Sequence, residues 1–202
     1  MVSYKTNTQA WDEAELVLGL KEKDEEAYRE LVRQYQAKLF RIAYGITLDR
    51  EESSDIVQDV FLRVYQHIHT FKGDSKFYFW LRRITINMCL NWQRRWKRRF
   101  RWRHQPLEKG EGENVVELGT ESYSPETLYR EKELEKIIQE GLKTIPEDAR
   151  TVFILKEMEG LSYEDIAGIL KINKGTVSSR IFYARQKLKR SISSLLNQGE
   201  TE

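Results

Sequence analysis

The residues of this chain best suited to binding chemistry lie near its C-terminal end. Between Lys171 and Gln198 there are seven Lys and Arg and no acidic residue. Lysine and arginine neutralise phosphates, whereas hydroxyl and aromatic side chains can reach base edges and thymine methyl groups. We therefore expect contacts to double-stranded DNA from eight side chains of this segment: Lys174, Thr176, Ser178, Ser179, Arg180, Phe182, Tyr183 and Arg185.

Two short helices joined by a tight turn are expected to position these side chains. Ser162 and Asp165 have the spacing of a capping box, and Asn173 suits the N-cap of the second helix. Apolar residues of the second helix recur at steps of three and four, so they share one face: Val177, Ile181, Ala184, Leu188, Ile192 and Leu195. This pattern is typical of a helix-turn-helix, whose second helix enters the major groove. An ordinary amphipathic hairpin with a solvated basic face is the alternative.

A second segment without acids combines cations with aromatic rings. From Ser75 to Leu107 there are ten Lys and Arg and no acidic residue. The part from Phe77 to about Phe100 is expected to form one long helix. Interspersed rings and cations can stack on unpaired bases and bind phosphates; the rings concerned are Trp92, Trp96 and Trp102. Alternatively the rings form a core and only the arginines face water, an interpretation that we favour for Trp80 and Trp92.

A third candidate surface is acidic. A helix is expected after a turn at residues 48–50, with a buried stripe of Ile56, Val57, Val60, Phe61, Val64, Tyr65 and Ile68. Its early polar positions are mostly acidic: Glu51, Glu52, Asp55 and Asp59, with Gln58 between them. Acidic residues near a helix start complement the helix dipole. The same residues could instead bind a partner, and both interpretations stay open.

Composition limits the class of protein. The chain has 202 residues, of which 40% are hydrophobic and 33% charged, and few β-branched alternating runs, so we expect an all-α fold. The single cysteine, Cys89, excludes an internal disulfide, and His67, His69 and His104 lack companion ligands, so no metal or other cofactor is expected. No signal peptide or long apolar run is found, which predicts a soluble, cytoplasmic protein without membrane insertion. No nucleophile, paired-carboxylate or phosphate-loop motif has supporting context, so no enzymatic activity is expected.

Changes in composition divide the chain into two helical modules and a linker. Residues 105–123 contain three glycines and five glutamates with little apolar periodicity, which predicts a flexible acidic linker between modules 1–104 and 124–202. Further helices are expected at residues 11–20, from Asp24 to Ile46, from Ser124 and from Thr144, and Ser75 is expected to cap the long basic helix. Two basic modules joined by an acidic tether suggest a protein that contacts DNA at two places.

Three segments carry a resemblance to a known family: Asp55–Phe71, Trp80–Arg95 and Glu159–Leu188. Together they resemble a bacterial RNA polymerase sigma factor of the extracytoplasmic-function group in the sigma-70 family. The resemblance implies a region 2 helical bundle before the linker and a region 4 helix-turn-helix after it. It also implies binding to core RNA polymerase through its β and β′ subunits, recognition of promoter DNA and help in opening the duplex. An anti-sigma factor, often membrane-embedded, is a further implied partner.

The resemblance also implies roles for individual residues. Asp55, Gln58 and Asp59 match positions that dock on the β′ clamp helices. Two sets of residues match positions that contact the minus-10 element. One set is a loop that holds a flipped non-template base: Phe71, Lys72, Gly73, Asp74 and Ser75. The other set lies on the following helix: Trp80, Arg83, Asn87 and Asn91. The segment from Thr176 to Arg185 matches the helix that reads the minus-35 element, and the linker matches a segment near the RNA exit path.

The chain departs from the family pattern at several positions. Lys171 occupies a turn position that is usually glycine, and a positive φ there would cost about 1 kcal/mol. Ser178 and Tyr183 stand where relatives are often basic, and residues 77–79 are unusually aromatic. A helix-turn-helix repressor or activator, with N-terminal helices that dimerise or sense a ligand, is the leading alternative but leaves the basic aromatic helix unexplained. A nuclease would require clustered acidic or histidine ligands, which the sequence does not show.

Overall fold

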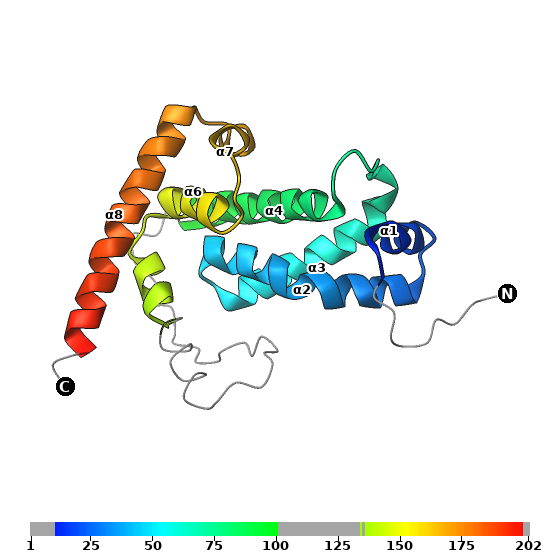
Figure 1. Ribbon diagram of the computed structural model, residues 1–202, viewed down its shortest axis with the longest axis horizontal. Coiled ribbons are helices and arrows are strands. Elements are labelled where there is room, and N and C mark those ends of the chain that lie inside the picture. Colours follow the sequence, from blue (N-terminus) through cyan, green and yellow to red (C-terminus); the bar gives the residue numbers. More distant parts are fainter. Residues whose placement is uncertain (1–10, 101–133, 135, 200–202) are drawn as a thin grey trace. The chain divides into compact units, whose positions relative to one another are not determined.

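The computed structural model describes residues 11–100, 134 and 136–199 (Figure 1). Its elements are α1 (Glu13–Lys21), α2 (Glu25–Thr47), α3 (Arg50–His67), the 3-10 turn η1 (Ile68–Thr70), α4 (Phe77–Phe100), α6 (Glu147–Glu157), α7 (Tyr163–Leu170) and α8 (Lys174–Gly199). Residues 136–143 are also helical. No β-strand occurs within these ranges, so the expected all-α fold is confirmed.

The chain separates into two compact units. The first contains the described residues of Met1–Ala43 and Glu51–Cys89, and the second those of Tyr44–Arg50 and Leu90–Glu202. The last turn of α2 and the C-terminal half of α4 therefore cluster with the C-terminal helices. The predicted linker, residues 105–123, lies outside the described residues.

Helices α1 to α3 and the first half of α4 build the core of the first unit. Aspartate side chains stabilise the N-terminal ends of α1 and α2. Asp12 accepts a hydrogen bond from the Glu15 N–H (2.7 Å), and Asp24 accepts one from the Glu26 N–H (2.9 Å). The core is formed by apolar side chains that recur at helical spacing, among them Leu31, Leu39, Ile42, Ile56, Val57, Val60, Val64 and Leu81. The helices predicted over residues 11–20 and 24–46 and after residue 50 are therefore confirmed.

The start of α4 differs from the prediction. Its first helical residue is Phe77, so the preceding position is Lys76 and not Ser75. The Phe77 N–H donates to the Glu13 carboxylate of α1 at 2.9 Å. Because the first turn of α4 contains no acidic residue of its own, this distant carboxylate also complements the positive end of the helix dipole.

The second unit contains the predicted helix-turn-helix. Helix α6 packs against α7 and α8, and α7 begins with the expected capping box between Ser162 and Asp165. Lys171 ends α7 in the left-handed region at φ 55°, as expected for a turn position usually filled by glycine. Asn173 then caps α8 by accepting from the Thr176 N–H at 2.7 Å. The apolar face of α8 is buried at Val177, Ile181 and Ala184.

Candidate nucleic-acid interface

The outward face of α8 carries most of the side chains expected to contact duplex DNA. Six of them are exposed: Lys174, Ser178, Ser179, Phe182, Tyr183 and Arg185. Thr176 and Arg180 are half-buried. The Thr176 hydroxyl donates to the Asn173 amide oxygen at 2.9 Å, so this side chain supports the helix start. The face therefore combines hydroxyls, two exposed rings and cations, as the sequence predicted.

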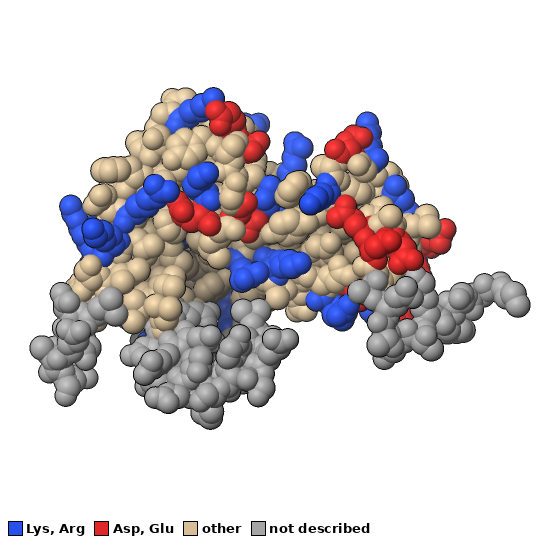
Figure 2. All heavy atoms as spheres, viewed as in Figure 1, with Lys and Arg blue, Asp and Glu red and all other residues tan. Residues whose placement is uncertain are grey.

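Three cations of this face form ion pairs with carboxylates on α6 and α7. Lys174 donates to Glu164, Arg180 to Asp148 at 3.1 Å, and Arg185 to Glu157 at 2.6 Å. Figure 2 shows acidic and basic side chains next to one another over this unit. The hydrogen bond from Lys174 lowers the pKa of the Glu164 carboxyl, and the one to Glu157 raises the pKa of Arg185. Sequence reasoning missed these acids because they lie on other helices.

Asp148 is shared between two helices of the second unit. Its carboxylate accepts from Lys97 at 2.7 Å and from Arg180 at 3.1 Å, and Glu147 lies 3.5 Å from the same lysine. The hydrogen bond from Lys97 lowers the pKa of Asp148, and the charges of Lys97 and Arg180 reinforce that shift. Burial opposes the charge of Lys97, but the two carboxylates outweigh it and raise the pKa of Lys97.

Helix α4 presents a second polar face. Trp80, Arg83, Asn87 and Asn91 are separated by three, four and four residues, which places them on one side of a continuous helix. Arg83, Asn87 and Asn91 are exposed, whereas Trp80 is half-buried. Arg94 continues this face and donates to the Asn91 amide oxygen at 2.9 Å. The four predicted helix positions therefore share one side of α4.

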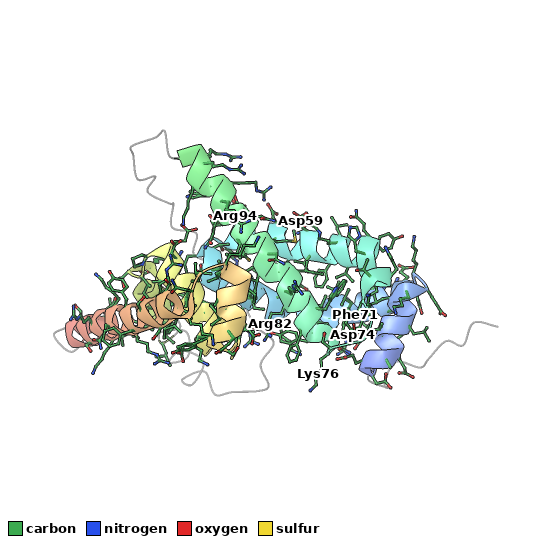
Figure 3. The ribbon with its side chains drawn as sticks, turned by 90° about the horizontal axis from the view of Figure 1, so that it is seen from above. Asp59, Phe71, Asp74, Lys76, Arg82 and Arg94 are labelled. Carbon is green, nitrogen blue, oxygen red and sulfur yellow. The ribbon has the colours of Figure 1, made fainter. Side chains whose placement is uncertain are left out.

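The loop before α4 divides into a buried anchor and an exposed tip. Phe71 is 6% exposed, and its ring lies 5.3 Å from that of Phe77 and 5.6 Å from that of Trp80. The following four residues, Lys72 to Ser75, are exposed, and Gly73 has φ +83°. Figure 3 shows Phe71 and Asp74 next to the start of α4. Phe71 therefore anchors the loop in the core, while the loop tip is accessible to solvent.

The acidic residues of α3 form a separate surface. Asp55, Gln58 and Asp59 are all exposed, while Ile56, Val57 and Val60 between them are buried. Farther along α3, Leu62 is 59% and Tyr65 46% exposed. The assignment of Tyr65 to the buried stripe was wrong, because its ring packs on the surface against Tyr28 with centroids 5.0 Å apart. Two exposed apolar side chains thus extend the acidic surface, which hydrophobic periodicity alone did not reveal.

Among the remaining aromatic residues, Trp92 is buried, as favoured from the sequence. Its ring stacks on that of Trp96 at 5.5 Å. Trp102 lies outside the described residues. Cys89 is buried, and burial raises the pKa of its thiol to about 12.

Metal-binding clusters and membrane-spanning helices are both absent from the part of the chain that the structure describes. Within it, no three His, Cys, Asp or Glu side chains come together as a metal-binding group. None of the helices described there combines the length and apolar character needed to cross a membrane.

Family comparisons match both halves of the chain. The family model described as "Sigma-70 region 2" matches residues 31–99, and the one described as "Sigma-70, region 4" matches residues 135–188. The RNA polymerase sigma-H factor of Pseudomonas aeruginosa is 35% identical over 95% of this chain and 98% of its own length. The ECF RNA polymerase sigma-E factor of Haemophilus influenzae is 36% identical over 93% of this chain and 98% of its own length. The ECF RNA polymerase sigma-E factor of Escherichia coli K12 is 34% identical over 91% of this chain and 95% of its own length.

Solved structures show the same fold. The sigma factor RpoE of Bartonella quintana, in complex with the anti-sigma factor NepR, has a TM-score of 0.59 at 21% identity and covers 82% of this chain and 96% of its own. CnrH, in complex with the cytosolic domain of CnrY, has a TM-score of 0.54 at 22% identity and covers 92% of this chain and 97% of its own.

Proposed function

Because this chain belongs to the extracytoplasmic-function group of sigma-70 family RNA polymerase sigma factors, we propose that it binds core RNA polymerase and directs the enzyme to specific promoters. It contributes no catalysis of its own in this role, since the polymerase performs the chemistry. It acts in the cytoplasm, where core polymerase and promoter DNA meet. Residues 1–104 act as region 2, residues 124–202 act as region 4, and residues 105–123 tether them near the RNA exit path.

One observation supports this function over that of a simple helix-turn-helix regulator. Arg83, Asn87 and Asn91 form an exposed stripe on α4, in a segment without acidic residues. A repressor that reads duplex DNA through α8 has no need of such a second face. Cations and amides on a helix beside an exposed loop suit a strand whose bases have left the stack.

Promoter recognition is divided between the two modules in this proposal. The exposed side chains of α8 read the minus-35 duplex, where hydroxyls and rings select bases and cations neutralise phosphates. The loop tip Lys72–Ser75, supported by buried Phe71, holds a flipped base of the minus-10 element, and Trp80 borders it. Asp55, Gln58 and Asp59 dock on the β′ clamp, and region 4 contacts the β subunit.

An anti-sigma factor is the third proposed partner. The two solved structures described above were determined with a protein bound, and NepR is named as an anti-sigma factor. A membrane-embedded anti-sigma factor would hold this protein away from the polymerase until it is released.

Reconstituted transcription tests the proposed function. The protein is mixed with core RNA polymerase, and start sites are mapped on genomic fragments, then on promoters altered separately at the minus-35 and minus-10 elements. We expect specific initiation that depends on this protein. Tyr183 and Ser179 variants should change only the minus-35 preference, and loop variants only the minus-10 preference. Lowered transcription by another holoenzyme, with no initiation by this one, would instead identify a repressor.

A further inference from the structure

The second compact unit joins residues of the region 2 match to residues of the region 4 match. The last turn of α2 and the C-terminal half of α4 belong to the region 2 match, residues 31–99, yet they cluster with α6, which belongs to the region 4 match, residues 135–188. The function proposed above gives this contact no role. Three polar links form it, and we call them the latch: Gln93 with Thr151, Lys97 with Asp148, and Ile46 with Arg150.

Arg150 of α6 closes the C-terminal end of α2. Its guanidinium donates to the Ile46 carbonyl at 3.3 Å and to the Ile145 carbonyl at 3.1 Å. The last turn of α2 contains no basic residue of its own. Arg150 therefore pairs a carbonyl that the helix leaves open and complements the negative end of the helix dipole. A residue of the region 4 match thus supplies a cap for a helix of region 2.

The two links to α4 are polar as well. The Gln93 amide donates to the Thr151 hydroxyl at 3.0 Å, and these side chains are 5% and 2% exposed. The Lys97 ammonium donates to the Asp148 carboxylate at 2.7 Å. A polar contact between two parts of one chain can separate, because water replaces the partners that each side loses. The latch therefore suits a reversible contact better than a permanent core.

A glycine lets α2 approach α6 closely. A Cβ added at Gly45 would lie 2.9 Å from the Ile154 Cδ1, and Ile154 is fully buried. Gly45 lies inside α2 and does not have a positive φ, so its backbone conformation does not require glycine. Because glycine weakens a helix interior, the close approach is what this residue provides.

The latched arrangement is too short to span a promoter. The minus-10 and minus-35 elements are centred about 25 base pairs apart, which is about 85 Å of B-form DNA. Asn91, a predicted minus-10 position, and Arg180, a predicted minus-35 position, are at most about 30 Å apart, because six helical residues and the two ion pairs of Asp148 join them. The two elements therefore cannot be bound together while Lys97 holds Asp148.

We propose that the latch holds the free protein closed, with α6 docked on the end of region 2, and that it opens when the protein binds both promoter elements on the polymerase. This inference rests on the proposed function and adds a conformational step to it. Opening frees Lys97 for a DNA phosphate. Contacts to the polymerase and to DNA favour the open state because only that state makes all of them.

A cleavable bridge between the two sides of the latch tests this step. Lys97→Cys and Asp148→Cys are combined in the full chain and joined by a short bismaleimide that contains a disulfide. Buried Cys89, whose thiol pKa is raised to about 12, should stay unreacted. We expect the bridge to form readily in the free protein. The bridged protein should lose about tenfold or more of its promoter-specific transcription, since linked sites lose avidity when geometry forbids binding both. Reduction should restore transcription.

A matched bridge controls for the reagent. Glu140→Cys and Lys143→Cys replace an exposed ion pair within one helical segment, and bridging them should leave transcription unchanged. Transcription by the protein bridged between residues 97 and 148 at the level seen after reduction would overturn the latch, as would failure of that bridge to form in the free protein. If the reduced protein and wild type both fail to initiate, the proposed function itself fails.

The yield of the same bridge reports opening directly. It should fall about fivefold or more when the protein is assembled with core polymerase on a promoter, because the closed state is depopulated. Labelling of the two cysteines by a monofunctional maleimide should remain efficient, which excludes simple protection. An equal bridging yield in the free protein and in the promoter complex would contradict the opening step.

A glycine substitution tests the latch from α2. Gly45→Leu adds a good helix former that collides with Ile154, so the free protein should lose most of the bridge while its circular dichroism stays helical. Gly168→Leu is the matched control, because Gly168 is exposed on α7 and a Cβ there meets no atom within 4 Å. Equal bridging in the two variants would overturn the docking of α6 on α2.

Discussion

At the scale of single residues, acids on neighbouring helices pair with several cations of α8. Lys174, Arg180 and Arg185 of α8 each face a carboxylate of α6 or α7. These pairs are largely exposed, so each contributes little to folding stability. If α8 binds DNA as proposed, a DNA phosphate must compete with a carboxylate for each of these cations. Asp148 has the widest influence, since it contacts both Arg180 and Lys97.

Asp148→Asn should therefore strengthen duplex binding on all sequences, by about 1.5- to 5-fold at low salt, because one competing negative charge is removed. The preferred minus-35 sequence should not change. Fluorescence anisotropy with specific and scrambled duplexes checks both statements, and Glu140→Gln, which removes an exposed acid paired with Lys143, is the matched control. Weaker binding by Asp148→Asn would mean that this carboxylate positions Arg180 for DNA instead of competing with it.

Acid should remove the contribution of the Asp148 ion pairs to folding stability. The pKa of Asp148 is lowered in the folded protein, so its pairs stabilise the fold above the ordinary carboxyl pKa and are lost as the pH falls through the lowered value. The Asp148→Asn variant lacks this contribution. Its loss of stability relative to wild type, measured by urea unfolding, should be constant near neutral pH and should shrink below about pH 4. A difference that grows on acidification would refute this role of the carboxylate.

At the scale of elements, turns and helix faces determine how each binding surface is presented. The turn between α7 and α8 requires a left-handed residue, and Lys171 supplies it at φ 55°. On α3, exposed carboxylates and the exposed Leu62 and Tyr65 share one helix above a buried apolar stripe. Both features can be altered without disturbing the core.

Lys171→Gly should stabilise the second unit by about 1 kcal/mol, because glycine adopts a positive φ without the steric cost that a Cβ imposes. Thermal unfolding measures the change. Lys171→Ala separates the two contributions, since alanine removes the long side chain but keeps the Cβ, and it should give no such gain. Equal stabilisation by alanine and glycine would assign the effect to removal of the lysine side chain and not to the positive φ.

The double substitution of Asp55 and Asp59 by Lys should abolish assembly with core polymerase, because it reverses the charge of the proposed docking surface. Helicity should be unchanged, since both side chains are exposed. Co-elution with core polymerase is the measurement. Reversal of Glu25 and Glu26, two exposed acids of α2, makes the same change in net charge and should leave assembly intact. Normal co-elution of the Asp55 and Asp59 variant would remove α3 from the polymerase interface.

At the scale of the whole molecule, the proposed binding surfaces are distributed over two compact units. The first unit contains the loop before α4 and the acidic surface of α3, and the second contains the helix-turn-helix. A tether between two such units lets each bind its promoter element while the chain keeps both at high local concentration.

Limited proteolysis of the free protein should cut first within residues 105–123, as expected for the acidic, glycine-containing tether predicted from the sequence. Mass spectrometry identifies the fragments, and circular dichroism should show that they remain helical. Shortening the tether should reduce transcription from promoters with the natural spacing more than it reduces binding to either isolated element. A protease-resistant unit across residues 100–130 would contradict the tether.

The sequence by itself determined those features whose causes are local. Helical periodicity placed α1 to α4 and the helix-turn-helix, and the caps at Ser162 and Asn173 act within three residues. The acid-free segments predict where DNA would bind. The strain at Lys171 was also predictable, because φ is set by a single residue and its turn.

Only the tertiary structure decided features that join residues far apart in the chain. The Phe77 N–H is bonded to a carboxylate 64 residues away, and Asp148 meets Lys97 and Arg180 across 51 and 32 residues. The guanidinium of buried Arg150 donates to the carbonyl of Ile46 at 3.3 Å, 104 residues earlier. Similarly, the rings of Phe71 and Phe79 look equivalent in sequence, yet packing buries the first and leaves the second in water. Burial and charge pairing depend on which helices meet, and no local pattern contains that information.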